Sequence, residues 1–322
     1  MAHSRSRARR LVGDIKWRVV DRWPYAVLKP IAQRRRDRYR AELARLPSVP
    51  TARAAVDAEV HMLCGAAHVD MGIWASWSLL RFFRNPVLYV HSDGTLAERD
   101  LGQWRDVIPG AVLVPSTEAD DMFAAEYADD FPTLARWRSR YWCARQVIDY
   151  HLFGQAEAFL GMDSDVLCFR RPREVEDALG RQPPAFRWNR DLGDYYSAER
   201  EVLASVTGLP VPAALNGGFL VYPRFSAEDF AFLDATLLNL ESASIDIFHW
   251  AMAQTLFAIC AARNAQSAPL PAPYDVRFGR APADLVARHY VGLWNVRPKY
   301  FLEGVPRLVS ELTRTSPASK AA

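Results

Sequence analysis

The sequence has few of the features that mark secreted, membrane-spanning or low-complexity proteins. No apolar run approaches the roughly 20 residues that cross a bilayer, and the longest, residues 251–262, is interrupted by Gln254 and Thr255. The arginine-rich N-terminal segment lacks the apolar stretch and cleavage site of a secretory signal. The few cysteines form no CxxC pair and no spacing typical of metal ligands; they are Cys64, Cys143, Cys168 and Cys260. We therefore expect free thiols, no transmembrane helix and a cytoplasmic protein.

What is present is the composition of a globular protein with an uneven charge distribution. The 322 residues are 50% hydrophobic and 24% charged, and a chain of this length can bury a core without disulfides or a structural metal. Residues 1–46 hold 14 Lys and Arg against 4 Asp and Glu, whereas the rest of the chain holds 26 against 33. We therefore separate a basic N-terminal extension, residues 1–50, from the body of the chain.

Three interpretations of this extension remain open. It is a peripheral contact with an anionic membrane surface, a nucleic-acid contact, or a solvated helical segment that packs on the body through its aromatic residues. Because the body is acidic, a nucleic-acid function for the whole chain is not expected.

From residue 51 onward, short apolar runs alternate with segments of helical periodicity. Strands are predicted at 58–64, 87–90, 111–114, 158–162 and 219–222, and helices at 71–83 and 134–153. Strands separated by helices predict an α/β fold, with a mostly parallel sheet covered by helices on both faces. We expect one domain over residues 51–312 and a flexible tail over 313–322. Ligands of such sheets bind beyond the carboxyl ends of the strands.

The most informative motif follows the predicted strand 158–162. Asp163 and Asp165 are two residues apart, so in an extended chain their carboxylates point to the same side. Hard divalent ions such as Mn²⁺ and Mg²⁺ prefer oxygen ligands of this kind, and they keep coordination sites open for phosphate oxygens and water. The pair therefore predicts a divalent metal site, with a solvated turn as the alternative.

A second candidate group lies far downstream. Gly292 follows His289 by three residues, and the cations Arg297 and Lys299 come within ten. An imidazole could complete a metal shell, and the two cations could neutralise phosphate oxygens. The alternative is a hydrogen-bonded structural histidine.

Two further segments fit the same chemistry. Asn216 stands before two glycines, Gly217 and Gly218, which would allow a ligand to approach the main chain. A plain turn before a strand is the alternative. Arg145 lies in the helix that precedes the two aspartates, from which its guanidinium could reach phosphate groups, although a surface arginine has the same spacing.

Together these segments resemble the metal-dependent nucleotide-sugar glycosyltransferases of the GT-A fold, in particular family 8, over roughly residues 58–303. The motifs are Met162–Val166 (the Asp-x-Asp element), Leu215–Gly218 (the Asn-Ala/Gly-Gly element) and His289–Gly292 (the start of His-x-x-Gly-x-x-Lys-Pro). The resemblance implies that Asp163, Asp165 and His289 bind Mn²⁺ or Mg²⁺. It also implies that Arg145 contacts the nucleotide sugar and Asn216 the donor sugar.

The sequence departs from the family pattern in two places. The family's Lys-Pro follows the glycine closely, whereas here Arg297 precedes the proline and comes later. The family's Asp-Gln pair corresponds to Ala253 and Gln254, with Asp246 as a substitute for the missing aspartate. No general base is evident. The chain is therefore interpreted as a divergent relative.

The resemblance implies a metal-dependent hexosyltransferase that moves a sugar from a nucleotide-diphosphate sugar, with UDP expected, to a glycan or other hydroxyl acceptor. In this hypothesis Asn216 and Gln254 orient the donor sugar and the acceptor. Asp163, which could also touch the ribose, binds the nucleotide sugar together with Arg145, Arg297 and Lys299. Two alternatives remain: an aspartate-nucleophile phosphohydrolase, and a binding-only protein with a degenerate site.

Overall fold

The computed structural model describes residues 22–49, 56–276, 284–292 and 296–315. The chain divides into two compact units, one formed by residues 47–289 and the other by residues 1–46 together with 290–322. Within the described ranges, no helix is both long and apolar enough to cross a membrane. All four cysteines are free thiols.

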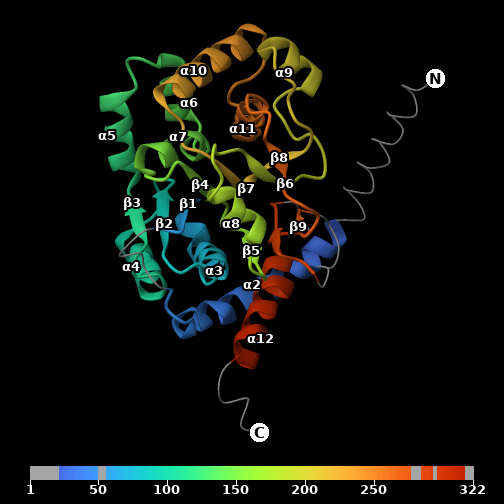
Figure 1. The fold of residues 1–322 in the computed structure, drawn as a ribbon. Coiled ribbons are helices and arrows are strands. Elements are labelled where there is room, and N and C mark those ends of the chain that lie inside the picture. The colour runs from blue at the N-terminus through green and yellow to red at the C-terminus, as the bar shows by residue number, and fades with distance from the viewer. Residues whose placement is uncertain (1–21, 50–55, 277–283, 293–295, 316–322) are drawn as a thin grey trace, which may run out of the picture. The chain divides into compact units, whose positions relative to one another are not determined.

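A seven-stranded sheet forms the centre of the larger unit (Figure 1). Its strands, in chain order, are β1 (Ala58–Cys64), β2 (Pro86–Ser92), β3 (Val112–Val114), β4 (Ala158–Met162), β6 (Arg187–Arg190), β7 (Leu215–Pro223) and β8 (Ala268–Pro269). They lie side by side in the order β3-β2-β1-β4-β7-β6-β8. The pairs β3–β2, β2–β1, β1–β4 and β6–β8 are parallel, whereas β7 runs antiparallel to both β4 and β6.

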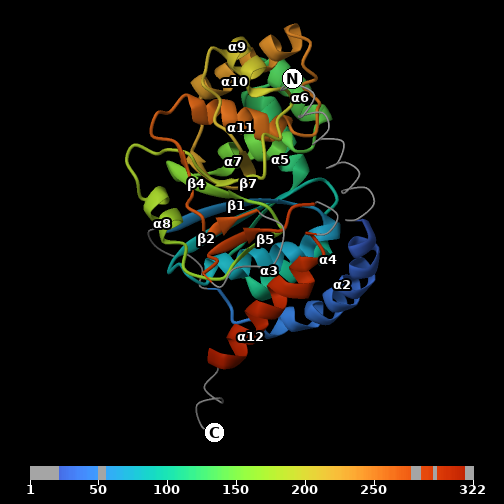
Figure 2. The same cartoon turned by 90° about the vertical axis from the view of Figure 1, so that its right-hand side faces the viewer.

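Helices cover both faces of this sheet, as Figure 2 shows, with α7, α10 and α11 on one side and α3 and α4 on the other. The helices of this unit are α3 (Val69–Leu80), α4 (Glu98–Val107), α5 (Ser116–Glu126), α6 (Pro132–Arg140), α7 (Ala144–Phe153), α8 (Arg173–Leu179), α9 (Arg200–Thr207), α10 (Ala227–Ser242) and α11 (Met252–Ala262), with a 3₁₀ turn at Ala66–His68. Every residue of β1 and β4 is buried, because both faces are covered. The predicted α/β fold with a mostly parallel sheet is confirmed.

A second, three-stranded sheet has the order β5-β10-β9 and consists of β5 (Val166–Cys168), β9 (Tyr274–Asp275) and β10 (Ala287–His289). The chain leaves the large sheet at the end of β4, makes a short turn, and enters this sheet at β5. Because β10 is antiparallel to β5, with His289 opposite Val166, the histidine lies next to the turn that carries the two aspartates. This pairing brings together segments that are far apart in the sequence.

Two details of the predicted elements are wrong. The helix predicted at 134–153 is two helices, α6 and α7, because Tyr141 adopts an extended conformation (φ −127°, ψ 105°). Its buried side chain donates a hydrogen bond from the hydroxyl to the carbonyl of Trp250 (2.5 Å), which holds the break in place. The segment from Asn216 to Gly218 lies inside strand β7 rather than before it.

A chain of buried polar side chains runs through β1 and β2. Glu59 accepts hydrogen bonds from the backbone N–H groups of Gln155 and Ala156 (3.1 and 3.0 Å), and its Oε1 lies 3.0 Å from Nε2 of His61. Nδ1 of His61 lies 2.9 Å from Nε2 of His91. If Nε2 of each ring carries the proton, every contact pairs one donor with one acceptor, so two neutral imidazoles satisfy the chain. His91 is thus part of the core.

The smaller unit contains α2 (Arg22–Glu42), a 3₁₀ turn at Leu43–Arg45, the π-helix η4 (Tyr300–Gly304) and α12 (Val305–Thr315). Nη1 of Arg35 donates to the carbonyl of Leu302 (3.1 Å), and the Arg36 guanidinium lies 5.8 Å from the ring centre of Phe301. Part of the basic segment is therefore a helix that packs on η4. Residues 1–21 lie outside the described residues, and membrane contact through the extension stays a prediction.

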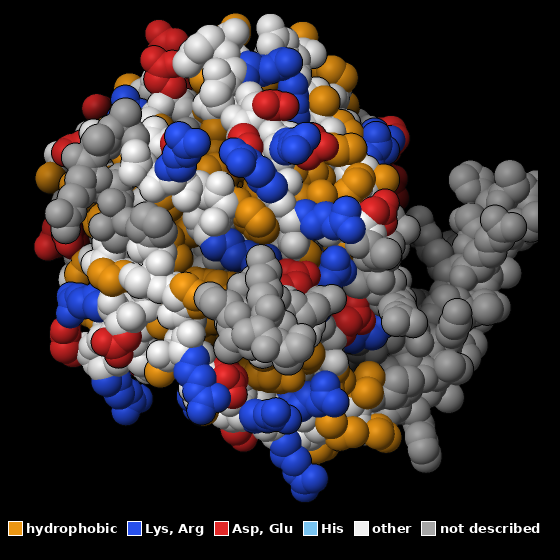
Figure 3. All heavy atoms as spheres, turned by 60° about the horizontal axis from the view of Figure 1, so that its bottom comes forward, with side chains coloured by type: hydrophobic (Ala, Val, Ile, Leu, Met, Phe, Trp, Pro, Cys, Tyr) orange, Lys and Arg blue, Asp and Glu red, His pale blue; other side chains and the backbone are white. Residues whose placement is uncertain are grey.

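The face of the molecule drawn in Figure 3 carries Lys and Arg side chains with Asp and Glu side chains between them. Positive charge on this face is therefore dispersed among charges of the opposite sign.

Candidate metal centre

Asp163, Asp165 and His289 come together in the larger unit. One ligand atom from each lies within 4.8 Å of the others. Nε2 of His289 is 2.9 Å from Oδ1 of Asp165 and 3.6 Å from Oδ2 of Asp163. Asp165 and His289 are buried, whereas the Asp163 side chain is 32% exposed. The cluster predicted from the sequence therefore exists as a geometric arrangement, with one carboxylate accessible to solvent.

The ring of His289 is held in a fixed orientation by a hydrogen-bonded chain. Its Nδ1 lies 2.8 Å from Oδ1 of Asn216, so Nδ1 donates its proton there and Nε2 faces the two aspartates. The amide of Asn216 is itself fixed, since its Nδ2 donates to Oδ2 of Asp191 (2.8 Å). Groups of this kind, behind a ligating histidine, set its tautomer and raise its affinity for a metal. Asn216 thus contacts His289, one of the three candidate metal ligands, directly.

The charges around His289 determine its protonation. Burial acts to lower the pKa of its imidazole, but the carboxylates of Asp165, Asp163 and Asp191 outweigh this effect and raise it. Without a cation, a proton on Nε2 would take the place of positive charge between the aspartates. The cluster therefore favours a positive charge at its centre.

Gly218 gives the cluster the space that it occupies. A Cβ at this position would lie 2.2 Å from Cε1 of His289 and 2.6 Å from Oδ2 of Asp163. The carbonyl of Gly218 also accepts a hydrogen bond from the backbone N–H of Asp163 (2.8 Å). The pairing of β7 with its neighbour β6 is irregular beside this glycine. Trp188 pairs with Leu220, whereas Asn189 pairs with Asn216. Strand β7 therefore bulges between Asn216 and Leu220.

Gln254, on α11, reaches the same bulge. Its Oε1 accepts from the N–H of Gly217 (3.0 Å), and its Nε2 donates to the carbonyl of Tyr195 (2.9 Å). Asp246, considered as a substitute for the family's aspartate, accepts from the N–H of Phe248 (2.9 Å) in the turn before α11. Gln254 is therefore next to the asparagine-glycine element, and Asp246 stabilises a turn. The predicted contacts of Gln254 with the substrates stay a prediction.

Arg145 belongs to an ion-pair network at the junction of α5, α6 and α7. Its Nη2 lies 2.9 Å from Oδ1 of Asp120, and its Nη1 lies 3.2 Å from Oδ2 of Asp149. Arg138 joins both carboxylates at 2.7 Å. The side chain of Arg145 is 13% exposed, so its predicted contact with a nucleotide sugar would compete with these pairs. That contact stays a prediction.

Arg297 and Lys299 belong to the smaller unit, and their contact with phosphates also stays a prediction. A Cβ at Gly292 would lie 3.2 Å from Nη2 of Arg297, so the glycine leaves room for this guanidinium.

Two residues that support the cluster were not predicted from the sequence. Nε2 of Gln146 donates to Oδ1 of Asp163 (2.7 Å), which orients the exposed carboxylate. Asp191 holds Asn216, as described above. Gln146 directly follows the predicted Arg145, so its place in that helix was a usable signal. Asp191 follows β6, whose residues (Arg-Trp-Asn-Arg) have no clear alternation of apolar and polar side chains, and this strand was not predicted.

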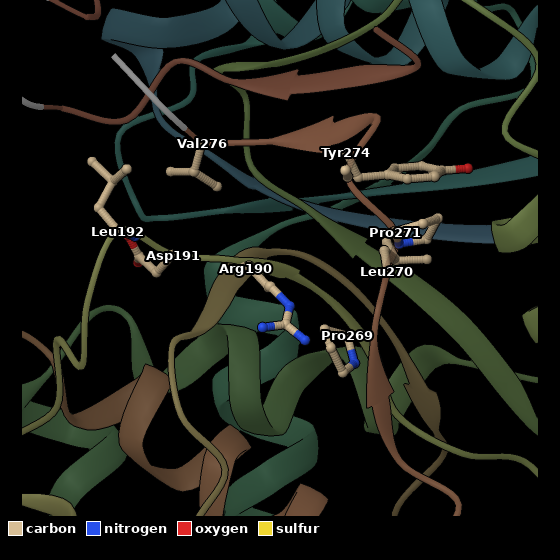
Figure 4. Close-up of a pocket in the computed structure, with 9 residues that line it drawn as sticks. Arg190, Asp191, Leu192, Pro269, Leu270, Pro271, Tyr274 and Val276 are labelled. Atoms are coloured by element: carbon tan, nitrogen blue, oxygen red, sulfur yellow. The ribbon is translucent and has the colours of Figure 1, made fainter. Parts of the chain in front are cut away.

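A cavity of about 450 Å³ lies between the end of β6 and the segment 269–276 (Figure 4). It is lined by Arg190, Asp191, Leu192, Pro269, Leu270, Pro271, Ala272, Tyr274 and Val276. Asp191 belongs both to this lining and to the hydrogen-bonded chain that reaches His289, so the cavity adjoins the cluster.

The donor set fits a hard divalent cation. Two carboxylates and a neutral imidazole suit Mn²⁺ or Mg²⁺, and three protein ligands leave positions for oxygen atoms of a substrate. The fixed tautomer of His289 directs a nitrogen lone pair toward the aspartates once the Nε2 proton leaves. The arrangement can therefore hold a cation in contact with a phosphorylated ligand.

No protein-family model matches the chain, and no curated protein sequence is similar to it. Its fold is similar to that of solved glycosyltransferases. The apo structure of the bifunctional glycosyltransferase WbbM has a TM-score of 0.51 at 13% identity, and the match covers 82% of this chain and 52% of WbbM. Mouse xyloside xylosyltransferase 1 in its apo form has a TM-score of 0.48 at 15% identity, with 73% of this chain and 97% of that one covered. The Mn/GDP form of core-mannan synthase A from Aspergillus fumigatus has a TM-score of 0.46 at 13% identity, with 79% and 87% covered. At these identities the likeness concerns the fold.

Proposed function

We propose that this chain is a GT-A glycosyltransferase, related to family 8, that uses a divalent cation to transfer a sugar from a nucleotide-diphosphate sugar to a hydroxyl acceptor. The observation that carries the proposal is the convergence of Asp163, Asp165 and His289 at the end of β4. The fold similarity to WbbM is consistent with it. The expected ion is Mn²⁺ or Mg²⁺, and the expected donor is a UDP-sugar.

In this proposal the chain's own residues hold and orient the reacting groups. Asp163, Asp165 and His289 hold the cation, whose charge would stabilise the negative charge that develops on the diphosphate as the sugar leaves. Gln146 fixes the Asp163 carboxylate, and Asn216 fixes the tautomer of His289. These contacts reduce the reorganisation needed when the donor binds.

The remaining predicted residues act on the substrates. Gln254 accepts a hydrogen bond from the backbone N–H of Gly217. From this position its amide would orient the donor sugar or the acceptor. Arg145, Arg297 and Lys299 would contact the nucleotide phosphates.

The proposal is tested by substitution at Asp165. A thermal-shift panel of UDP-, GDP- and CMP-sugars, with and without Mn²⁺, should show one class that stabilises the protein only with Mn²⁺. Asp165→Asn removes a ligand charge and should weaken that Mn²⁺-dependent binding at least about tenfold. The matched control is Asp177→Asn, because Asp177 is exposed on α8, and it should bind as the original protein does.

Two outcomes would contradict the proposal. Mn²⁺-dependent turnover that survives in Asp165→Asn would remove this residue from the site. Release of inorganic phosphate from a phosphomonoester, without nucleotide binding, would indicate the phosphohydrolase instead.

A further inference from the structure

We propose that the cavity beside the metal centre binds the sugar acceptor, and that Arg190 recognises an anionic group, a carboxylate or a phosphate, on that acceptor. This inference rests on the proposed function and specifies its second substrate. Four features of the larger unit support it. They are the position of the cavity, the apolar residues of its walls, the hydrogen-bond partners of its charged side chains, and the exposure of its rim to solvent.

Two independent connections place the cavity next to the metal centre. On one side, Asp191 accepts a hydrogen bond from Asn216, which contacts His289. On the other side, β9 runs parallel to β10, with Tyr274 beside Ala287 and the following residue beside Arg288. Val276, a wall of the cavity, directly follows β9, and His289 directly follows Arg288 on β10. A molecule in the cavity would therefore lie beside a sugar donor held at the cation.

The walls suit a carbohydrate. Leu270, Tyr274 and Val276 are buried, and two prolines, Pro269 and Pro271, complete a largely apolar surface. The C–H faces of a sugar pack on such surfaces, while a few polar groups fix its orientation. The volume of about 450 Å³ lies within the range of about 300–1,000 Å³ that is usual for small-molecule sites.

Arg190, which is exposed to solvent, brings a positive charge to the edge of this apolar surface. Its guanidinium makes no hydrogen bond or ion pair with another residue of the described ranges, and Figure 4 shows it extending from β6 toward Pro269. The neighbouring carboxylate of Asp191 accepts from the N–H of Leu192 (2.7 Å) and from Asn216 instead. A free guanidinium binds a carboxylate or a phosphate through two parallel hydrogen bonds.

The position of this charge favours the acceptor over the donor. The phosphates of a donor belong at the cation, and the carboxylates of the cluster would repel a further anionic group close to them. Arg190 offers a place for such a group on the wall of the cavity, next to Asp191. The rim of the cavity is open, since Leu192 is 39% exposed and Pro271 is also exposed, so a longer acceptor could continue into solvent.

Binding of matched probes to the full chain tests the inference. Saturation-transfer NMR titrations, with UDP and Mg²⁺ present, would compare p-nitrophenyl β-glucuronide with p-nitrophenyl β-glucoside, and glucose 6-phosphate with glucose. We expect at least one anionic probe to bind about tenfold more tightly than its neutral counterpart. The pair that shows the preference distinguishes carboxylate from phosphate.

Substitution at Arg190 then identifies the responsible group. Arg190→Gln should bring the anionic and neutral probes within about twofold of each other, while the neutral probes bind as before. Arg187→Gln is the control on the same strand, because Arg187 donates to the carbonyls of Phe186 and Gln266 (2.8 and 2.7 Å) outside the cavity. This variant should keep the preference for the anionic probe.

The inference is overturned if neither anionic probe is preferred, or if Arg190→Gln keeps the preference. Mn²⁺-dependent binding of UDP, GDP and CMP, measured on the same protein preparation before UDP and Mg²⁺ are added, separates the two proposals. If UDP binds and the probes show no charge preference, the acceptor inference alone fails. If none of UDP, GDP and CMP binds in the presence of Mn²⁺, the glycosyltransferase proposal fails.

Discussion

Gly217 and Gly218 are neighbours on β7, yet their surroundings differ. A Cβ on Gly217 would meet Phe257 at 3.4 Å, an ordinary contact, whereas a Cβ on Gly218 would lie 2.2 Å from the ring of His289. The sequence indicated that these glycines allow a close approach to the main chain. The structure shows that at Gly218 the approaching groups are the chain's own His289 and Asp163.

This difference gives a prediction with an internal control. Gly218→Ala should displace His289 and weaken Mn²⁺ binding by about tenfold or more, because a ligand would leave its position. Gly217→Ala should bind Mn²⁺ nearly as the original protein does. Isothermal titration with Mn²⁺ measures both. Equal affinities in the two variants would show that the crowding at Gly218 is relieved without cost to the site.

At the scale of elements, the junction of α5, α6 and α7 depends on buried charge. Asp149, on α7, is 1% exposed and accepts from both Nε and Nη2 of Arg138 (2.7 and 3.0 Å). Burial raises the pKa of Asp149, against the influence of Arg138 and Arg145. The carboxylate therefore compensates two guanidinium groups that the fold has removed from water.

Asp149→Ala should be strongly destabilising, since it leaves Arg138 buried with Asp120 as its remaining carboxylate. We expect the free energy of unfolding to fall by about 3 kcal/mol or more. The control is Arg105→Ala on α4, which breaks the exposed ion pair with Glu98 and should cost less than about 1 kcal/mol. Urea unfolding of the variants measures the difference, and similar losses in both would contradict the assigned role of burial.

The elements also show which parts of the fold can be read from the sequence. β1, β4 and α3 were predicted closely because apolar runs and helical periodicity mark them. The break between α6 and α7 contains no glycine or proline; it depends on the contact of Tyr141 with Trp250, which only tertiary structure supplies. The three residues of the candidate metal centre were selected from the sequence because each belongs to a short motif, whereas Gln146 and Asp191 carry no motif of their own.

At the scale of the whole molecule, buried neutral histidines should make stability depend on pH. Burial lowers the pKa of His61, and it lowers the pKa values of His91 and His151 well below the usual range. Below about pH 6.5 the unfolded chain binds protons that the native protein does not, so the free energy of unfolding falls as the pH falls. His289 has the opposite effect, because its pKa is raised.

His61, His91 and His151 lower the free energy of unfolding at acidic pH, whereas His289 alone raises it. We therefore expect a net loss of stability on acidification from about pH 7 to pH 5.5. Each of the three contributes at most about 1 kcal/mol per pH unit in this range. Urea unfolding across the range measures the loss, and His91→Gln should reduce the slope. A free energy of unfolding that rises on acidification would show that these imidazoles accept protons in the native state.

The turn between β4 and β5 joins the large sheet to the small one, and β10 carries His289 to the same place. A cation held there would be a removable cross-link between the turn at residues 163–165 and residue 289. Because folding assembles this site, binding of the ion would stabilise the folded state over the unfolded chain. Supply of the ion would then govern how long the folded protein persists, besides whether its chemistry proceeds.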